Sequence, residues 1–271
     1  MSYWAGVHGL RELRVRDLLR PLIHARHLCG GKRFANFNRV LEFQSSGHSK
    51  YNGLTLDLQK RFSHNWQARL AYTYSKAKDD RPDATSVVPG TDDAKNAMDA
   101  LNLGDEWAYA DTDVRHRIVL SGVWNLAYAE NMSGAARAFL GGWSLSGIVS
   151  YQSGQPFSAL VSTDINNDQN RASDRVPGTK RNSLRNPSQF SVDPRVTKDI
   201  HVIGDSHVQL IAEAFNLTNR SNVTRLRNSQ YSYTPATNTF VAGSTDPVTG
   251  YLSPSATSGP RTYQFAIKLL F

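Results

Sequence analysis

The C-terminal stretch 259–271 alternates between aromatic or apolar residues and mostly polar or small ones. Tyr263, Phe265, Ile267, Leu269 and Phe271 occupy every second position and continue to the last residue. A period of two sends the two sets to opposite faces of a β-strand. A strand with an apolar outer face and a polar inner face suits a transmembrane β-barrel, because lipid offers no solvent to unpaired backbone groups.

Composition excludes several other classes of protein. The chain has 271 residues with a mean hydropathy of −0.46, and it contains no apolar run of about 18 residues, so no transmembrane helix is predicted. The net charge of +8 is spread over the whole chain without a nucleic-acid-binding motif, and we expect no nucleic-acid partner. The single Cys29 removes any disulfide framework.

Alternation recurs upstream and predicts about eight strands. The segment 51–62 places Leu54, Leu56 and Leu58 opposite Thr55 and Asp57. After a short turn at 63–65, Trp66 begins a second clear strand that carries Arg69 on its polar face. The other expected strands cover 39–46 (weak), 113–126, 143–151, 197–203, 207–217 and 262–271. A charged side chain such as Arg69 is costly in lipid but acceptable in a hydrated lumen.

The connections differ in length in a regular order. Those at 63–65 and 204–206 are tight and 129–142 is of medium length, whereas 77–113, 160–193 and 219–258 are long and polar. Outer-membrane barrels have short periplasmic turns and long extracellular loops. With Phe271 at the periplasmic side, every long loop falls outside. Aromatic residues then form two girdles, Phe62, Trp66, Tyr128, Trp143 and Phe271 at the periplasmic ends and Tyr74, Tyr151 and Tyr263 at the outer ends.

Residues 1–33 form a basic lead-in that differs from the rest of the chain. Leucines among Arg and Lys suggest a short amphipathic helix or a disordered stretch, and a non-native origin is the favoured interpretation. No cleavable signal peptide is predicted after Met1. His24, His27 and Cys29 lie close in sequence, but no second cluster completes a zinc site.

Several segments in order resemble one family of proteins. They are 51–62, 70–76, Arg115–Arg117, Gly141–Trp143 with Gln152–Phe157, and Glu213–Asn219. From about residue 34 to 271 the chain resembles the C-terminal part of TonB-dependent outer-membrane receptors, in the subgroup that carries a carboxypeptidase-regulatory-like domain. The terminal strand ending at Phe271 likewise resembles the signal that the barrel-insertion machinery reads.

The resemblance implies an energised importer of the Gram-negative outer membrane for a scarce ligand such as a siderophore, glycan or peptide. The family's plug, its TonB-contacting segment and the first half or more of its 22-stranded barrel are not matched here. The expected partners are therefore outer-membrane lipid, the insertion machinery and an unidentified ligand, with TonB reached only through the missing plug.

Candidate chemical sites are weak. Asp164, Asn166, Asp168, Asn170 and Asp174 alternate like the start of a calcium loop, but Gln169 replaces the required glycine and no closing Glu follows, so a hydrated surface loop is favoured. The stretch 142–147 lacks the spacing of a nucleophile elbow. The group Asp113, Arg115, His116 and Arg117 is interpreted as paired lumenal charge rather than as an acid–base site. We expect no catalytic, cofactor-binding or metal residues and no enzymatic activity.

The predicted fold is all-β, an antiparallel barrel segment over residues 34–271 that forms an open curved sheet of about eight strands. Two other functions stay open. Eight strands can close as a small self-contained barrel that acts as a passive pore or anchor, and a secreted β-sandwich adhesin would instead pack two sheets around an apolar core. Strand pairing separates these three interpretations.

Overall fold

The computed structural model describes residues 47–80, 97–99, 102–129, 131–166, 171–172 and 174–271. The lead-in 1–33, its histidines and Cys29, and the strand expected at 39–46 lie outside these residues. In the described part no helix is long and apolar enough to cross a membrane.

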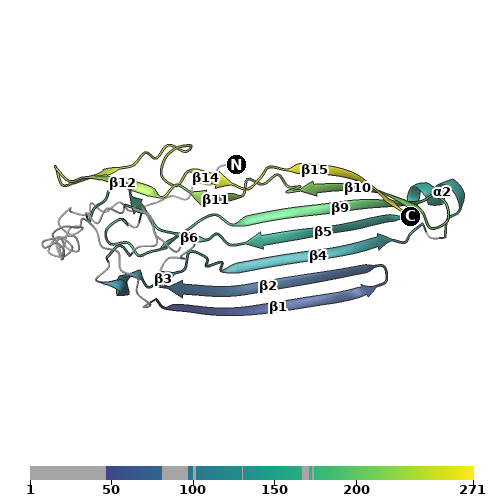
Figure 1. The fold of residues 1–271 in the computed structure, drawn as a ribbon, viewed down its shortest axis with the longest axis horizontal. Coiled ribbons are helices and arrows are strands. Elements are labelled where there is room, and N and C mark those ends of the chain that lie inside the picture. Colours follow the sequence, from purple (N-terminus) through teal and green to yellow (C-terminus); the bar gives the residue numbers. More distant parts are fainter. Residues whose placement is uncertain (1–46, 81–96, 100–101, 130, 167–170, 173) are drawn as a thin grey trace.

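One large sheet dominates the fold (Figure 1). Its long strands follow the order β1-β2-β4-β5-β9-β10-β15, and every adjacent pair is antiparallel. These strands are β1 (Ser49–Ser63), β2 (Trp66–Asp79), β4 (His116–Leu126), β5 (Trp143–Gln152), β9 (Gln189–His201), β10 (His207–Phe215) and β15 (Thr262–Leu270). Each has at least 9 residues, which is enough to cross a bilayer when tilted.

The smaller elements lie in the connections. They are η1 (Leu103–Glu106), β3 (Ala108–Tyr109), α2 (Gly134–Leu140), β6 (Pro156–Phe157), β7 (Leu160–Val161), β8 (Leu184–Arg185), β11 (Val223–Leu226), β12 (Ser229–Thr234), β13 (Thr239–Ala242) and β14 (Pro254–Thr257). β3 extends the large sheet at the outer end of β2, whereas β6–β8 and β11–β14 form separate small ladders.

The large sheet is open. Among the described residues β1 pairs only with β2, and β15 pairs only with β10. Because the strand direction reverses at each step along the seven long strands, β1 and β15 run in the same direction. The two edges therefore cannot close on each other with antiparallel pairing.

The apolar rows predicted from the sequence share one face of the sheet. Leu54, Leu56 and Leu58 of β1 lie opposite Tyr74, Tyr72 and Leu70 of β2. The same face continues through Leu120 and Val149 to Val208 and Leu210, which oppose Leu269 and Ile267 of β15. Phe265 and Ile267 are 78% and 72% exposed.

Large apolar side chains do not form an interior in the described part of the chain. The buried hydrophobic residues are Ala108, Ala110, Ala129, Ala159, Val161 and Ala214, while Glu106, Asp113 and Asp174 are among the largest fully buried side chains. A β-sandwich needs two apolar faces packed together, and these residues provide none. The exposed rows instead form the outer surface of a barrel wall.

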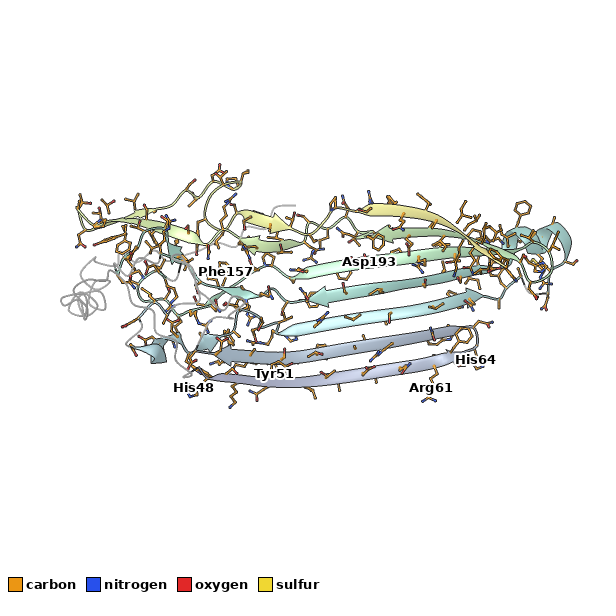
Figure 2. The ribbon with its side chains drawn as sticks, viewed as in Figure 1. His48, Tyr51, Arg61, His64, Phe157 and Asp193 are labelled. Atoms are coloured by element: carbon orange, nitrogen blue, oxygen red, sulfur yellow. The ribbon has the colours of Figure 1, made fainter. Side chains whose placement is uncertain are left out.

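Loop lengths separate the two ends of the sheet as predicted. The β1–β2 and β9–β10 turns, α2 and the C-terminus gather at one end, and the long connections gather at the other (Figure 1). Figure 2 places Arg61 and His64 at the turn end and His48 and Phe157 at the loop end. In the β1–β2 turn His64 and Asn65 both have positive φ, which matches the twist of a two-residue hairpin.

The structure differs from the sequence prediction at the start of β9 and within the connection 129–142. The loop expected at 160–193 ends earlier, because β9 begins at Gln189 rather than at 197. Pro194 lies within β9 and pairs with Gly147 of β5, whereas the β9–β10 ladder stops at Arg195. A proline is tolerated where no strand needs its missing N–H. The stretch expected as a medium turn at 129–142 contains the short helix α2.

We expect Val149→Arg to lower the free energy of unfolding by about 2–4 kcal/mol, because its side chain lies mid-strand on the lipid-facing surface. The neighbouring Ser150→Arg points to the opposite face and should cost about 1 kcal/mol or less. Urea titration of the protein folded in phospholipid vesicles, followed by tryptophan fluorescence, measures both. Equal losses would contradict the assignment of faces.

Candidate functional site

The inner face of the sheet is a polar wall. It carries Thr55, Asp57, Gln59, Arg69, Ser121, Ser146, Asp193, Arg195, Glu213 and Gln264. Arg69 Nε donates to Asp57 Oδ1 at 3.0 Å, and Arg195 forms an ion pair with Glu213 on the neighbouring strand. These cross-strand pairs satisfy charges that would be unfavourable in lipid.

A hollow of about 660 Å³ lies against this wall. Its charged lining includes Arg69, Asp193, Arg195 and Glu213, from β2, β9 and β10. Asp193 lies on β9 between the two ends of the sheet (Figure 2). Its Oδ1 accepts hydrogen bonds from Ser191 Oγ at 2.6 Å and from the backbone N–H of Asn216 at 2.7 Å. The wall therefore presents both signs of charge at fixed positions.

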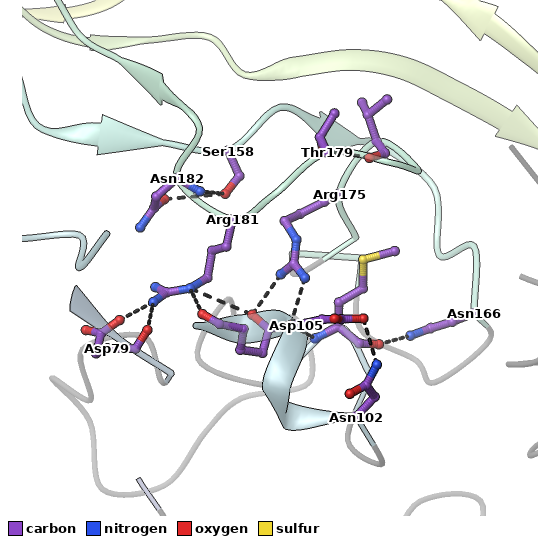
Figure 3. Close-up of polar contacts among 12 residues, drawn as sticks. Asp79, Asn102, Asp105, Ser158, Asn166, Arg175, Thr179, Arg181 and Asn182 are labelled. Atoms are coloured by element: carbon purple, nitrogen blue, oxygen red, sulfur yellow. Dashed lines mark hydrogen bonds and ion pairs between the residues drawn. The ribbon is translucent and has the colours of Figure 1, made fainter. Parts of the chain in front are cut away.

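The long connections fold together at the outer end through buried arginines. Arg175 donates to both carboxylate oxygens of Glu106, at 2.9 and 2.8 Å, and both side chains are almost fully buried. Arg181 donates from Nε to the backbone oxygen of Glu106 at 3.1 Å and forms an ion pair with Asp79 at the end of β2 (Figure 3). A bidentate arginine–carboxylate pair fixes geometry as well as charge.

Asp113 ties these connections to the sheet. Its buried carboxylate pairs with Arg185 of β8 and accepts the backbone N–H of Ala77 at 2.6 Å. The Asp113 carboxylate thus accepts a hydrogen bond from β2 that a backbone oxygen of β4 would accept if that strand continued beside it. The loop residues are held to the barrel wall by charge rather than by an apolar core.

A second cavity of about 580 Å³ opens between the connections. Its lining includes the polar and charged residues Glu106, Arg175, Arg181, Asn182, Asn186 and Arg225. Arg181 Nη1 and Arg175 Nε are buried without a hydrogen-bond partner among the described residues, although Arg181 Nη1 lies 3.6 Å from Asp111 Oδ1. This cavity and the hollow at the inner wall both carry charged side chains among the described residues.

Asp79 is the last residue of β2 and lies beyond the lipid-facing part of that strand. Burial raises the pKa of Asp79 above the ordinary carboxyl value, and the ion pair with Arg181 only partly opposes that effect. The cause is the placement of this carboxylate beneath the connections, where water no longer stabilises its charge.

In the calcium-like stretch 164–174, the described polar side chains form hydrogen bonds with the backbone of the connections. Asp174 Oδ2 accepts the backbone N–H of Ile165 at 2.9 Å, and Asn166 Nδ2 donates to the backbone oxygen of Met98 at 2.8 Å. Residues 167–170 lie outside the described part. Within that part no group of three or more His, Cys, Asp or Glu side chains is arranged to hold a metal.

The residues of the group 113–117 do not all have the surroundings that the sequence predicts. Asp113 pairs with arginines as expected, and its contact with Arg115 is 3.8 Å. His116, however, does not face the lumen as predicted. It pairs with Tyr74 across the ladder and its Nδ1 lies 3.0 Å from the Tyr72 hydroxyl, so it belongs to the outer aromatic row. The elbow-like stretch 142–147 lies at the start of β5, in a strand.

Sequence reasoning missed Glu106, Arg175 and Arg181. They were assigned to long polar loops without a role. A usable signal was the opposite charge of two connections, because ten Asp and Glu fall in 77–113 whereas Arg171, Arg175, Lys180, Arg181 and Arg185 fall in 160–193.

A family model described as "Outer membrane beta barrel domain" matches residues 16–180 and 175–264. The chain belongs to this outer-membrane β-barrel family. Its apolar rows therefore face lipid of the outer membrane, and its polar face lines a lumen. The first match begins within the lead-in expected at 1–33. A search of individually curated proteins finds no significant match.

We expect Arg175→Met to loosen the outer connections by about 3–5 kcal/mol, because it removes the bidentate partner of the buried Glu106 and leaves only the longer contact with Arg181, 3.7 Å from Nε to Oε2. The double variant Glu106→Gln/Arg175→Met should recover much of that loss, since the substituted amide is uncharged and its oxygen still accepts the N–H of Met98. Hydrogen exchange of the Val176 amide, which donates to Ala159, reports the change. Unchanged exchange in the single variant would contradict a structural role for the pair.

Proposed function

We propose that this outer-membrane barrel protein is the C-terminal part of a TonB-dependent receptor that imports a scarce ligand. The observation that carries the proposal is the open sheet, in which β1 and β15 both lack an outer partner among the described residues. An unpaired edge is not stable in lipid, so further strands must complete the wall. An even-stranded antiparallel barrel requires an odd number of them.

The polar surfaces fit this function. The outer connections provide the cavity near Arg181 and Asn182, which a ligand would reach first from outside. The inner wall with Arg69, Arg195 and Glu213 would line its path once TonB has displaced a plug. We assign no TonB contact to residues of this chain, and no step of this transport breaks or forms a covalent bond.

The resembling segments occupy coherent places in the structure. The stretch 51–62 lies in β1, Arg115–Arg117 leads into β4, and Glu213–Asn219 leads out of β10. These are strand ends and strand interiors of the wall, where a shared barrel would place them. They support the TonB-dependent subgroup without identifying its ligand.

A passive pore or anchor is the second candidate, because strand parity allows eight strands as well as a larger even number. With seven long strands described, one further strand at 39–46 would let β15 find an antiparallel partner within this chain. A closed eight-stranded barrel has an interior that side chains nearly fill, so such a protein would conduct weakly.

The first test is the size of the protein in the outer membrane. An antibody against this chain should detect a polypeptide well above 30.1 kDa in the outer-membrane fraction, with tryptic peptides from a plug upstream of Met1. A 30.1 kDa band without such peptides would contradict the receptor proposal. Steady conductance of that purified band in planar bilayers, lost after unfolding, would then establish the passive pore.

A further inference from the structure

Four cationic side chains surround the ring of Tyr109. The guanidinium carbons of Arg115 and Arg185 lie 5.0 and 5.1 Å from the ring centroid. The ammonium groups of Lys78 and Lys76 lie 5.5 and 5.7 Å from it. We call Tyr109 and these four cations the Tyr109 cluster.

Tyr109 and the two lysines of the cluster lie on the lipid-facing side, just beyond the outer aromatic row. Lys76 and Lys78 continue the alternation of Tyr72 and Tyr74 along β2, and Tyr109 lies directly opposite Lys78. At about 3.3 Å per residue, Lys76 and Lys78 lie roughly 7 and 13 Å beyond Tyr74 along a tilted strand. That is the depth of the lipid headgroups when Tyr74 marks the edge of the hydrocarbon.

Positive charge in the cluster exceeds the negative charge around it. Asp113 is paired with Arg185 and lies 3.8 Å from Arg115, so one carboxylate faces two arginines. Asp80, further along the same face, accepts hydrogen bonds from the backbone and the ring of His48. Lys50 adds a further cation because it lies directly opposite Lys78 on β1, and like charges in that position are destabilising. Arg115 Nε is buried without a hydrogen-bond partner in the described part of the chain.

We propose that the Tyr109 cluster binds the phosphate of an anionic lipid headgroup in the outer leaflet. Basic groups at the membrane surface attract anionic lipids, and this cluster also offers two arginines and two lysines around one ring. The site rests on the outer-membrane assignment and not on the proposed import function. Its failure would leave the receptor proposal untouched.

Tyr109 offers a direct reporter. A hydrogen bond with Arg115 and the nearby lysines lower the pKa of its phenol below the usual range. A bound phosphate would cancel part of this positive field, so the pKa of Tyr109 should rise when the lipid binds. Titration of ring-¹³C-labelled tyrosine, assigned with Tyr109→Phe, measures it. No rise on adding the anionic lipid would overturn the site.

The binding test uses the full chain in nanodiscs of phosphatidylcholine titrated with phosphatidic acid, a phosphate-monoester lipid, and read by native mass spectrometry. Lys76→Gln/Lys78→Gln should weaken binding about tenfold to thirtyfold. The matched control Lys180→Gln/Lys268→Gln removes the same charge at an exposed loop position and on the inner face of β15, and it should bind like the wild type. Equal weakening in both double variants would show that only net charge matters and overturn the site.

Two further experiments complete the test. The first identifies the source of the phosphate, and the second tests whether the double variant has a folding defect. Millimolar inorganic phosphate should not displace the lipid, and displacement would show a soluble-anion site instead. In phosphatidylcholine alone the Lys76→Gln/Lys78→Gln variant should melt at the same or a higher temperature than the wild type, because repulsion with Lys50 is relieved. Phosphatidic acid should raise the melting temperature of the wild type only. A variant that melts lower in both lipids would contradict the proposal.

Discussion

The fold depends on one constraint, that backbone N–H and C=O groups inside a bilayer have no water to pair with. The long strands meet this constraint by pairing along six antiparallel ladders, and each strand is long enough to span the hydrocarbon. Once the backbone is paired this way, the pleat assigns alternate side chains to lipid and to lumen. The apolar row of β15 and the charged pair Arg195–Glu213 are two results of the same geometry.

The protein is consequently inverted relative to a water-soluble domain. Its large apolar side chains are exposed, and its fully buried side chains include Glu106, Asp113 and Asp174. Order at the outer end comes from arginine–carboxylate pairs that join sequence segments about 70 residues apart. Buried charges of this kind are sensitive to the loss of one partner, so the connections are specified by pairing rather than by packing.

Much of the wall was predictable because its signal is local. Alternation in 51–62 and 262–271 gave strands with correct faces, and loop length gave the two ends. The start of β9 at Gln189 was not predicted, and whether a proline is tolerated at 194 depends on whether β10 continues beside it, which is a tertiary fact. His116 was misassigned because it was grouped with its charged sequence neighbours, although it alternates in phase with Ile118 and Leu120 of β4. The Arg175–Glu106 pair could not be located, since charge complementarity between two loops does not state which residues meet.

A membrane wall requires that odd-numbered residues of β15 face lipid and even-numbered ones face a hydrated lumen. Single-cysteine variants from 263 to 270, in a Cys29→Ser background and spin-labelled in bilayers, test it through collision with oxygen and with a water-soluble nickel complex. We predict high oxygen access at 263, 265, 267 and 269 and high nickel access between them. Low access to both reagents at the odd positions would mean a dry protein interior and would contradict the membrane wall.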